Sequence, residues 1–322
     1  MSSKPDSEKE ILLTSAEQMM EAGRYAEAAV LYGRLVEQYP GEESFLLAQA
    51  WAFHDSGSRE EAICCFETLF AAELKLKVFT GFAFDELVRL YRDGRQYDRL
   101  VAICRQAVEA QPDEYPLLRE LGNAFLVAGM TSEAVEVFEK ITRLEPDAPE
   151  LFCLYGDALV ADGKYDAAEA AYGEAVALDP EAAAHFYQRL ANALAESGAL
   201  DRAEILLSRS LATCPGDPLC LIRLAEVQVK QQHLFEARHS VEAAVACNPR
   251  FGASYYNRLA RALADAGCHF DAVEMFDRAI ALEENNAFFY LYQAESYEKL
   301  NLPEQAEEAR RKAKGLSAGN RA

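Results

Sequence analysis

The chain has 322 residues and carries 53 acidic against 32 basic side chains, for a formal net charge of -21. This surplus of acid argues against a general nucleic-acid binder, which needs a basic surface, and against docking on anionic lipid. The first residues, MSSKPDSEKE, contain no apolar signal core, and no later run approaches the roughly 20 apolar residues of a membrane span. We therefore expect a cytoplasmic protein that binds neither nucleic acid nor membrane.

The first quarter of the chain reads as a polar lead followed by two helical hairpins. Residues 1–8 are polar and charged and are expected to be disordered, and hairpins are expected over 9–40 and 43–74. The second hairpin lacks a closing proline, so AAELKLKV is expected to prolong its last helix until the next unit begins near Gly81. The apolar connection 76–84 either packs against the adjacent hairpin or forms a bend or a patch for a partner.

The hairpins over 81–112, 115–146 and 149–180 show the pattern more fully, although the turn DGRQYD of the first is expected to be one residue too long. In the last of these, the first helix has large residues and one glycine at helical spacing, which leaves a stripe that another backbone can approach. The second helix alternates small and aromatic residues on its packing face. These positions are Phe152, Tyr155, Gly156, Leu159, Gly163 at the turn, Ala168, Tyr172, Ala175 and Pro180.

The same order stands 34 residues earlier, at Leu118, Leu121, Gly122, Phe125, Gly129, Ala134, Phe138 and Pro146. Further hairpins are expected over 184–215, 218–249 and 253–284, and a ninth unit over 287–316. Gln232 replaces the usual turn glycine of the seventh, so its turn is expected to be looser. Arg310 replaces a packing aromatic in the last helix, whose polar face would end the stack in water, and the tail 317–322 is expected to be frayed.

The recurring order of a large residue, a Leu/Tyr-Gly pair, an aromatic, then Ala, aromatic, Ala and Pro resembles the tetratricopeptide repeat. The resemblance covers nearly the whole chain. It implies an all-α, right-handed α-solenoid of about nine αα-hairpins, in which the first helix of each hairpin lines an inner groove. It does not by itself name what the groove binds.

No catalytic constellation is present in the sequence. There is no Gly-x-Ser-x-Gly, phosphate-binding loop or His-Glu-x-x-His motif, and the five histidines do not share a helical face. The eight cysteines form no Cys-x-x-Cys pair and mostly stand where the repeat needs a small apolar side chain, so reduced structural cysteines are expected, with a disulfide or metal role as the alternative. We expect no enzyme activity, no metal site and no cofactor.

The resemblance places groove residues at the second, fifth, ninth and twelfth places of each repeat. At the fifth and ninth places the array is apolar or acidic near its ends and polar in its middle. Amides bond both the donors and the acceptors of a peptide backbone, and the arginine fork holds a carboxylate at two points. The predicted peptide-binding residues are Arg89, Arg92, Arg119, Asn123, Gln188, Asn192, Asn257, Arg261 and Trp51.

Arg119 and Asn123 have the spacing of the family's carboxylate clamp for chaperone C-termini, but the further cations of that clamp have no match, since Cys153 and Asp157 stand there. In the alternative interpretation the polar inner residues are solvated, or they pair across neighbouring helices with Asp85, Asp157 or Glu226.

Trp51, the one tryptophan, is either buried against the N-terminal repeat or an anchor for a partner, a role in which tryptophan is over-represented. Tyr255, Phe288 and Tyr292 are a second, weaker candidate surface. We predict a non-catalytic scaffold, adaptor or co-chaperone that binds an extended peptide or a partner helix of unknown identity. The alternatives are a structural or self-assembling homo-oligomer and a regulatory subunit of an enzyme on another chain.

Overall fold

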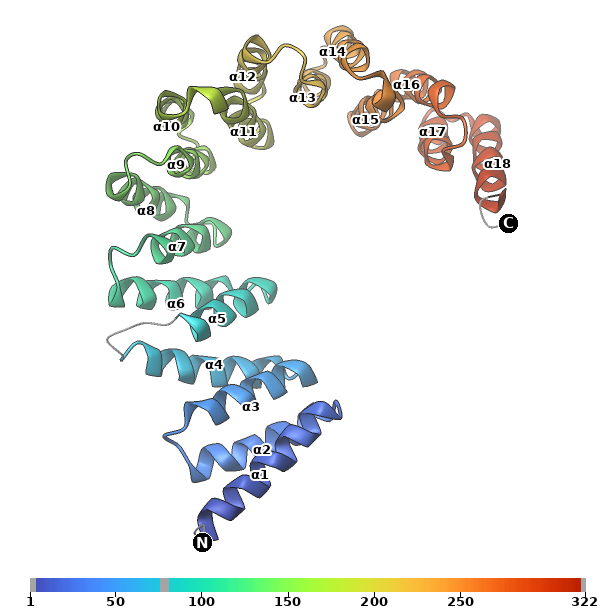
Figure 1. Cartoon of the computed structure of the whole chain (residues 1–322). Coiled ribbons are helices and arrows are strands. Elements are labelled where there is room, and N and C mark those ends of the chain that lie inside the picture. Colours follow the sequence, from blue (N-terminus) through green and yellow to red (C-terminus); the bar gives the residue numbers. More distant parts are fainter. Residues whose placement is uncertain (1–3, 76–80, 320–322) are drawn as a thin grey trace. The chain divides into compact units, whose positions relative to one another are not determined.

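The computed structural model describes residues 4–75 and 81–319, and within these ranges every regular element is a helix (Figure 1). The chain divides into two compact units, Met1–Leu144 and Glu145–Ala322. In each unit consecutive helices pack against one another as antiparallel hairpins, so each unit is a solenoid of helical hairpins. The predicted all-α class built from helical hairpins is confirmed.

The first unit contains eight helices among the described residues. They are α1 (Lys4–Glu21), α2 (Tyr25–Gln38), α3 (Glu43–Ser56), α4 (Arg59–Glu73), α5 (Phe82–Asp93), α6 (Tyr97–Ala110), α7 (Tyr115–Val127) and α8 (Thr131–Leu144). Odd-numbered helices are the first, and even-numbered helices the second, of each hairpin.

The second unit contains ten α-helices and two short 3-10 turns among the described residues. The helices are α9 (Pro149–Ala161), α10 (Tyr165–Leu178), α11 (Ala183–Glu196), α12 (Leu200–Thr213), α13 (Pro218–Lys230), α14 (Leu234–Cys247), α15 (Gly252–Asp265), α16 (His269–Leu282), α17 (Ala287–Lys299) and α18 (Pro303–Gly319). The 3-10 turns η1 (Pro180–Ala182) and η2 (Pro249–Phe251) precede α11 and α15.

Two hairpins, α7–α8 and α9–α10, close where an aromatic ring of the second helix meets a glycine of the first. A Cβ placed on Gly122 would lie 2.7 Å from the ring of Phe138, and one placed on Gly156 would lie 2.5 Å from the ring of Tyr172. Both rings are almost fully buried. The missing side chain therefore lets the ring pack directly on the partner helix backbone, which dispersion and burial both favour.

The turns within hairpins share one left-handed residue whatever its type. Gly163 has φ +75°, and Arg95, Gln232 and Asn301 take the same region with φ of 54°, 65° and 58°. The Gln232 turn was predicted to be looser, and this is wrong: Gln232 N–H donates to Val229 at 3.0 Å and the next amide donates to Gln228 at 2.8 Å, the same lengths as at Gly163. Packing of the two helices imposes the left-handed residue although a side chain costs roughly 1–2 kcal/mol there.

The third turn also differs from its prediction. It is not one residue too long, because Arg95, not Gly94, is its left-handed residue, and Arg95 stands at the same place in its repeat as Gly163 does. Gly94 has φ -82° and simply ends α5. The glycine in the sequence was a misleading mark of the turn, since a neighbouring residue supplies its conformation.

The end of α4 differs from the prediction as well. Its helix does not run on through AAELKLKV but ends at Glu73, whose carboxylate accepts a hydrogen bond of 3.4 Å from the Ala83 amide in the first turn of α5. This bond satisfies a free amide of a helix start and ties the two helices together. Most of the connection 76–84, residues 76–80, lies outside the described residues.

At the chain ends, helices enter segments predicted to be irregular. α1 begins at Lys4, inside the predicted disordered lead 1–8, and α18 continues to Gly319, inside the predicted frayed tail 317–322. A proline in the first turn of α1 is compatible with a helix, because the amide that it lacks has no partner within the helix at that position.

Candidate protein-binding surface

In the first unit, Trp51 forms part of an aromatic cluster on α3, α4 and α5. Its ring lies 5.7 Å from that of Phe66, 6.4 Å from that of Phe82 and 5.4 Å from that of His54, all edge to face. Trp51 is half-buried, and Phe82 remains 43% exposed. The indole therefore packs against rings of its own helix and of the two helices that follow it, and the cluster continues to the surface at Phe82.

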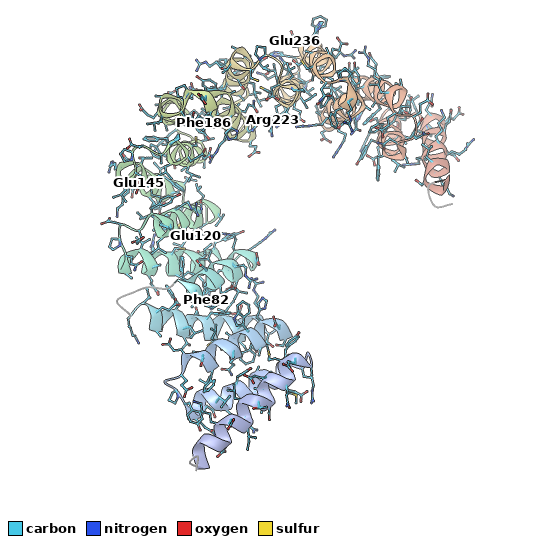
Figure 2. All side chains as sticks on the ribbon, viewed as in Figure 1. Phe82, Glu120, Glu145, Phe186, Arg223 and Glu236 are labelled. Atoms are coloured by element: carbon cyan, nitrogen blue, oxygen red, sulfur yellow. The ribbon has the colours of Figure 1, made fainter. Side chains whose placement is uncertain are left out.

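Two of the predicted arginines are engaged within this unit. Arg89 donates to Glu86 on its own helix at 2.7 Å and to His54 Nε2 at 3.3 Å. Arg92 on α5 forms an ion pair with Glu120 of α7, which Figure 2 labels. Both arginine side chains are 45% exposed, so these pairs are surface pairs of modest strength.

Arg119 and Asn123 stand four residues apart on α7. Arg119 is exposed, and its guanidinium carbon lies 5.7 Å from the ring centroid of Tyr115 one turn earlier. Asn123 is half-buried. Among the described residues neither side chain makes a hydrogen bond or an ion pair, so their donors and acceptors are open to solvent or to a ligand.

In the second unit, one contact repeats between successive inner helices. Counted from the predicted start of each repeat, an arginine at the sixth place meets the residue at the ninth place of the preceding repeat. We call the series the inner ladder, and its rungs are Arg189–Asp157 at 2.6 Å, Arg223–Asn192 at 2.7 Å, Arg258–Glu226 at 2.7 Å, and a final contact between Tyr292 and Arg261 with the cation 5.0 Å from the ring centroid. Figure 2 labels Arg223, the middle arginine.

The inner ladder was missed by reasoning from the sequence, which did not count the sixth place of the repeat among the groove positions. Its signal was nonetheless visible, because Arg189, Arg223 and Arg258 recur at intervals of 34 and 35 residues. Asp157 also accepts a hydrogen bond of 2.5 Å from the buried Tyr172, and burial followed by the Asp157 charge raises the pKa of that phenol. The first rung is thus fastened to the core of its hairpin.

Two predicted binding residues of α11 form hydrogen bonds with other residues of the second unit. Asn192 accepts the hydrogen bond of Arg223. Gln188 donates to Ser210 of α12 at 3.0 Å and to Asp217, the N-cap residue of α13, at 2.8 Å. Both side chains therefore connect neighbouring helices, through partners other than the Asp85, Asp157 and Glu226 that the alternative interpretation named.

The remaining two, Asn257 and Arg261, lie on α15. Asn257 Oδ1 is buried and has no hydrogen-bond partner among the described residues. Arg261 lines two clefts. One, of about 510 Å³, lies between α13 and α15, and the other, of about 240 Å³, lies between α15, α16 and α17.

The weaker aromatic candidates, Tyr255, Phe288 and Tyr292, differ in how far their side chains are exposed. Tyr255 is 8% exposed and belongs to the core. Phe288 is 66% exposed on α17, and Tyr292 lines the smaller cleft. The surface available to a ligand therefore contains Phe288 and Tyr292 but not Tyr255.

Metal binding or reaction chemistry would depend chiefly on the histidines, acids and cysteines of the described part of the chain. They contain no group of three or more His, Cys, Asp or Glu side chains that could hold a metal ion. Burial raises the pKa of the Cys65 thiol to about 11 and those of Cys104 and Cys153 to about 12, so these thiols stay protonated and unreactive near neutral pH. Within the part of the chain that is described, every helix is too short or too polar to cross a bilayer.

Comparison with known proteins gives a family. The family model of the tetratricopeptide repeat matches residues 17–67, 86–149 and 154–218, which is more than half of the chain. A search of curated proteins finds no significant match.

Three of the solved structures that are similar to this chain are one hetero-tetramer and two TPR proteins. The APC/C hetero-tetramer Cut9-Hcn1 is 18% identical with a TM-score of 0.39, and the match covers 95% of this chain but only 52%, about half, of that one. The C-terminal part of a TPR repeat-containing protein from Cytophaga hutchinsonii is 18% identical with a TM-score of 0.49, over 73% of this chain and 95% of that one. YrrB, described as a TPR protein with an unusual peptide-binding site, is 17% identical with a TM-score of 0.36, over 58% and 95%.

The repeated glycine–aromatic packing, the left-handed turns and the family match agree, and the resemblance predicted from the sequence is confirmed. The chain belongs to the tetratricopeptide repeat family, whose repeats are scaffolds for protein–protein interaction.

Proposed function

We propose that this chain is a non-catalytic scaffold or adaptor that binds an extended segment of a partner protein along its inner helices. One observation carries the proposal: inner positions that do not serve the core hold polar side chains with no partner among the described residues, Arg119 and Asn123 in the first unit. The guanidinium of Arg119 and the amide of Asn123 make no hydrogen bond or ion pair among the described residues, and they match the needs of a carboxylate and a peptide backbone.

The aromatic cluster supports the same proposal from a different direction. Trp51 and Phe82 give the first unit an apolar surface on the helices that precede α7. Tryptophan and arginine are the residues in which interface energy concentrates, because each combines a large contact area with a polar edge. A partner that covers the indole and bonds to Arg119 would use both.

The engaged residues have a lesser role in this proposal. Arg89, Arg92, Gln188 and Asn192 must first release an intramolecular partner, so binding through them gains less free energy than binding through Arg119, Asn123, Asn257, Arg261 or Trp51. The proposed contact residues are therefore the second group.

The test is a capture experiment from cell lysate, read by mass spectrometry, with the wild-type chain and with Arg119→Glu/Asn123→Ala. Arg34→Glu is the matched control, since Arg34 is an exposed arginine of the outer helix α2 with no described partner. Circular dichroism first establishes equal helicity. The proposal expects a protein that the wild type and the control retain and the double variant loses. Equal retention by all three chains would show that α7 is not the contact.

A further inference from the structure

The last rung of the inner ladder is reversed. In the three rungs before it, the arginine stands at the sixth place and an acceptor at the ninth place of the preceding repeat. In the last rung the arginine is Arg261, at the ninth place, and the sixth place of the next repeat holds Tyr292, whose ring centroid lies 5.0 Å from the guanidinium carbon. Arg261 is therefore the one arginine of the inner ladder that has neither a carboxylate nor an amide as its partner.

The charge of Arg261 is not compensated within the described part of the second unit. Its one described interaction is with the ring of Tyr292, whose face attracts the cation but leaves the N–H groups at the guanidinium edge unbonded. Glu226, which lines the larger cleft with it, already accepts two hydrogen bonds from Arg258, at 2.7 and 3.0 Å. An exposed fork with unbonded donors beside a cleft is a site for an anion.

An apolar strip lies next to this fork. Phe288, Leu291, Tyr292 and Glu295 follow one another at i, i+3, i+4 and i+7 along α17, so they share a face of the helix. Tyr292 and Glu295 line the smaller cleft together with Arg261, which shows that this face is turned toward it. Phe288 is 66% and Leu291 is 40% exposed, so the strip presents large apolar side chains to solvent.

The flanking acids restrict the anion. Asp265 lines both clefts with Arg261, and Glu295 lines the smaller one. They do not pair with Arg261, and when Lys230, Arg258 and Lys299 are counted too, the lining of each cleft has a surplus of at most one positive charge. A single carboxylate matches this charge better than a dianion such as a phosphate, so an aspartate or glutamate side chain is favoured over a phosphorylated one.

The remainder of the ladder limits where in the second unit a ligand can bind. A ligand carboxylate at α9 or α11 would have to displace Asp157 from Arg189, which holds it through two hydrogen bonds of 2.6 and 3.1 Å. Both side chains are 29% exposed, and exchange of one carboxylate for another there gains nothing. Among the arginines of the inner ladder, only Arg261 can bond to a ligand carboxylate without first breaking a hydrogen bond to another residue of the unit.

We propose that the face formed by Arg261, Tyr292, Phe288 and Leu291 binds an internal segment of a partner protein in which a carboxylate side chain is next to a large apolar side chain. The carboxylate accepts the Arg261 fork, and the apolar side chain covers Phe288 and Leu291. This inference rests on the proposed function and gives its binding surface in the second unit a ligand class.

The test is a selection from a random twelve-residue peptide library displayed on phage. The full chain carries Arg119→Glu/Asn123→Ala, so that peptides for the first unit do not dominate. It is compared with the same chain carrying Arg261→Gln and with a control carrying Arg209→Gln, an exposed arginine of the outer helix α12 that makes no side-chain hydrogen bond or ion pair among the described residues. We expect peptides with Asp or Glu next to Leu, Ile, Met, Phe or Trp, enriched by the parent and the control only.

One enriched peptide is then synthesised with its acid intact and as the amide, and binding is measured by fluorescence polarisation. Loss of the charged hydrogen bonds should weaken binding by about 10- to 100-fold for the amide peptide, and equally for Arg261→Gln with the intact peptide. Enriched peptides without an acid, or equal enrichment by the Arg261→Gln chain, would overturn this inference and leave the proposed function standing. If neither the chain with Arg119→Glu/Asn123→Ala nor the wild-type chain enriches any peptide, both this inference and the proposed function are contradicted.

Discussion

The inner helices of the two units use the same repeat position in opposite ways. In two repeats of the first unit the sixth place is acidic, at Glu86 and Glu120, and Glu120 forms an ion pair with Arg92 from the twelfth place of the preceding repeat. In three repeats of the second unit the sixth place is arginine, and Arg258, for example, bonds to Glu226 from the ninth place of the preceding repeat. Three ninth-place residues of the second unit, Asp157, Asn192 and Glu226, are thus bonded within the unit, whereas Asn123 at the ninth place of α7 has no described partner. The two units therefore differ in which inner polar groups are already bonded.

The two units share their hairpin core, which gives the largest expected effect. Gly122→Val in the first unit and Gly156→Val in the second each place a branched side chain against a buried ring, at Phe138 or Tyr172, where a Cβ alone would lie within 3 Å. We expect each to destabilise its unit by about 2–3 kcal/mol, since overpacked cores lose roughly this much. Urea unfolding followed by circular dichroism measures the loss.

The control for this pair is Gly173→Ala in α10, a helical glycine with nothing within 4 Å of its Cβ position. Alanine should stabilise that helix by about 0.5–1 kcal/mol. If either valine variant were as stable as the wild type, the direct packing of ring on backbone would not be what closes the hairpins.

Removing an arginine of the inner ladder should cost the second unit a smaller free energy of unfolding, which the first unit should not lose. Arg189→Ala leaves the partly buried Asp157 without its cation, while Arg119→Ala in the first unit removes a side chain with no polar partner. We expect a loss of about 1 kcal/mol for the former, reduced by its partial exposure, and close to none for the latter. A double-mutant cycle with Asp157→Asn isolates the coupling, and a coupling of zero would remove the ladder from the account.

The smallest effect concerns the acidic sixth place of the first unit. Burial, and then the charges of Glu120 and Glu86, raise the pKa of Asp85. A carboxyl whose folded pKa is raised favours the folded state in its protonated form, so this favourable contribution is present at low pH and is lost as pH rises through the folded pKa. Asp85→Asn should raise the urea midpoint at neutral pH and leave it unchanged in acid. A midpoint that falls at neutral pH would contradict this.

The hairpin cores could be predicted from the sequence because they depend on volume and period. Gly156 and Tyr172 stand 34 residues after Gly122 and Phe138, and in both hairpins the ring packs on the glycine. The turns were harder, since packing of the helices forces Arg95 and Gln232 into a conformation that their residue types do not signal. The end of α4 depends on one side chain, Glu73, that bonds to an amide ten residues later.

The candidate surface was only partly predictable, because residue type does not tell an engaged polar group from an open one. Asn123 and Asn192 stand at the same place in their repeats, yet Asn192 accepts a hydrogen bond from Arg223 and Asn123 has no described partner. Arg223 stands at the sixth place of the repeat after Asn192, whereas the corresponding residue after Asn123 is Leu154, which carries no donor. Such a pairing appears only when the distance between neighbouring helices is known.

The most direct test of the central claim, that a partner binds where inner polar groups are left open, is hydrogen–deuterium exchange on the chain with and without the partner captured by the wild type. The account predicts added protection in peptides from α7, or from α15 and α17, and little change in α9 and α11, whose inner groups are already bonded. Protection confined to the outer helices α10, α12 and α14, or concentrated on the bonded rungs of α9 and α11, would contradict it.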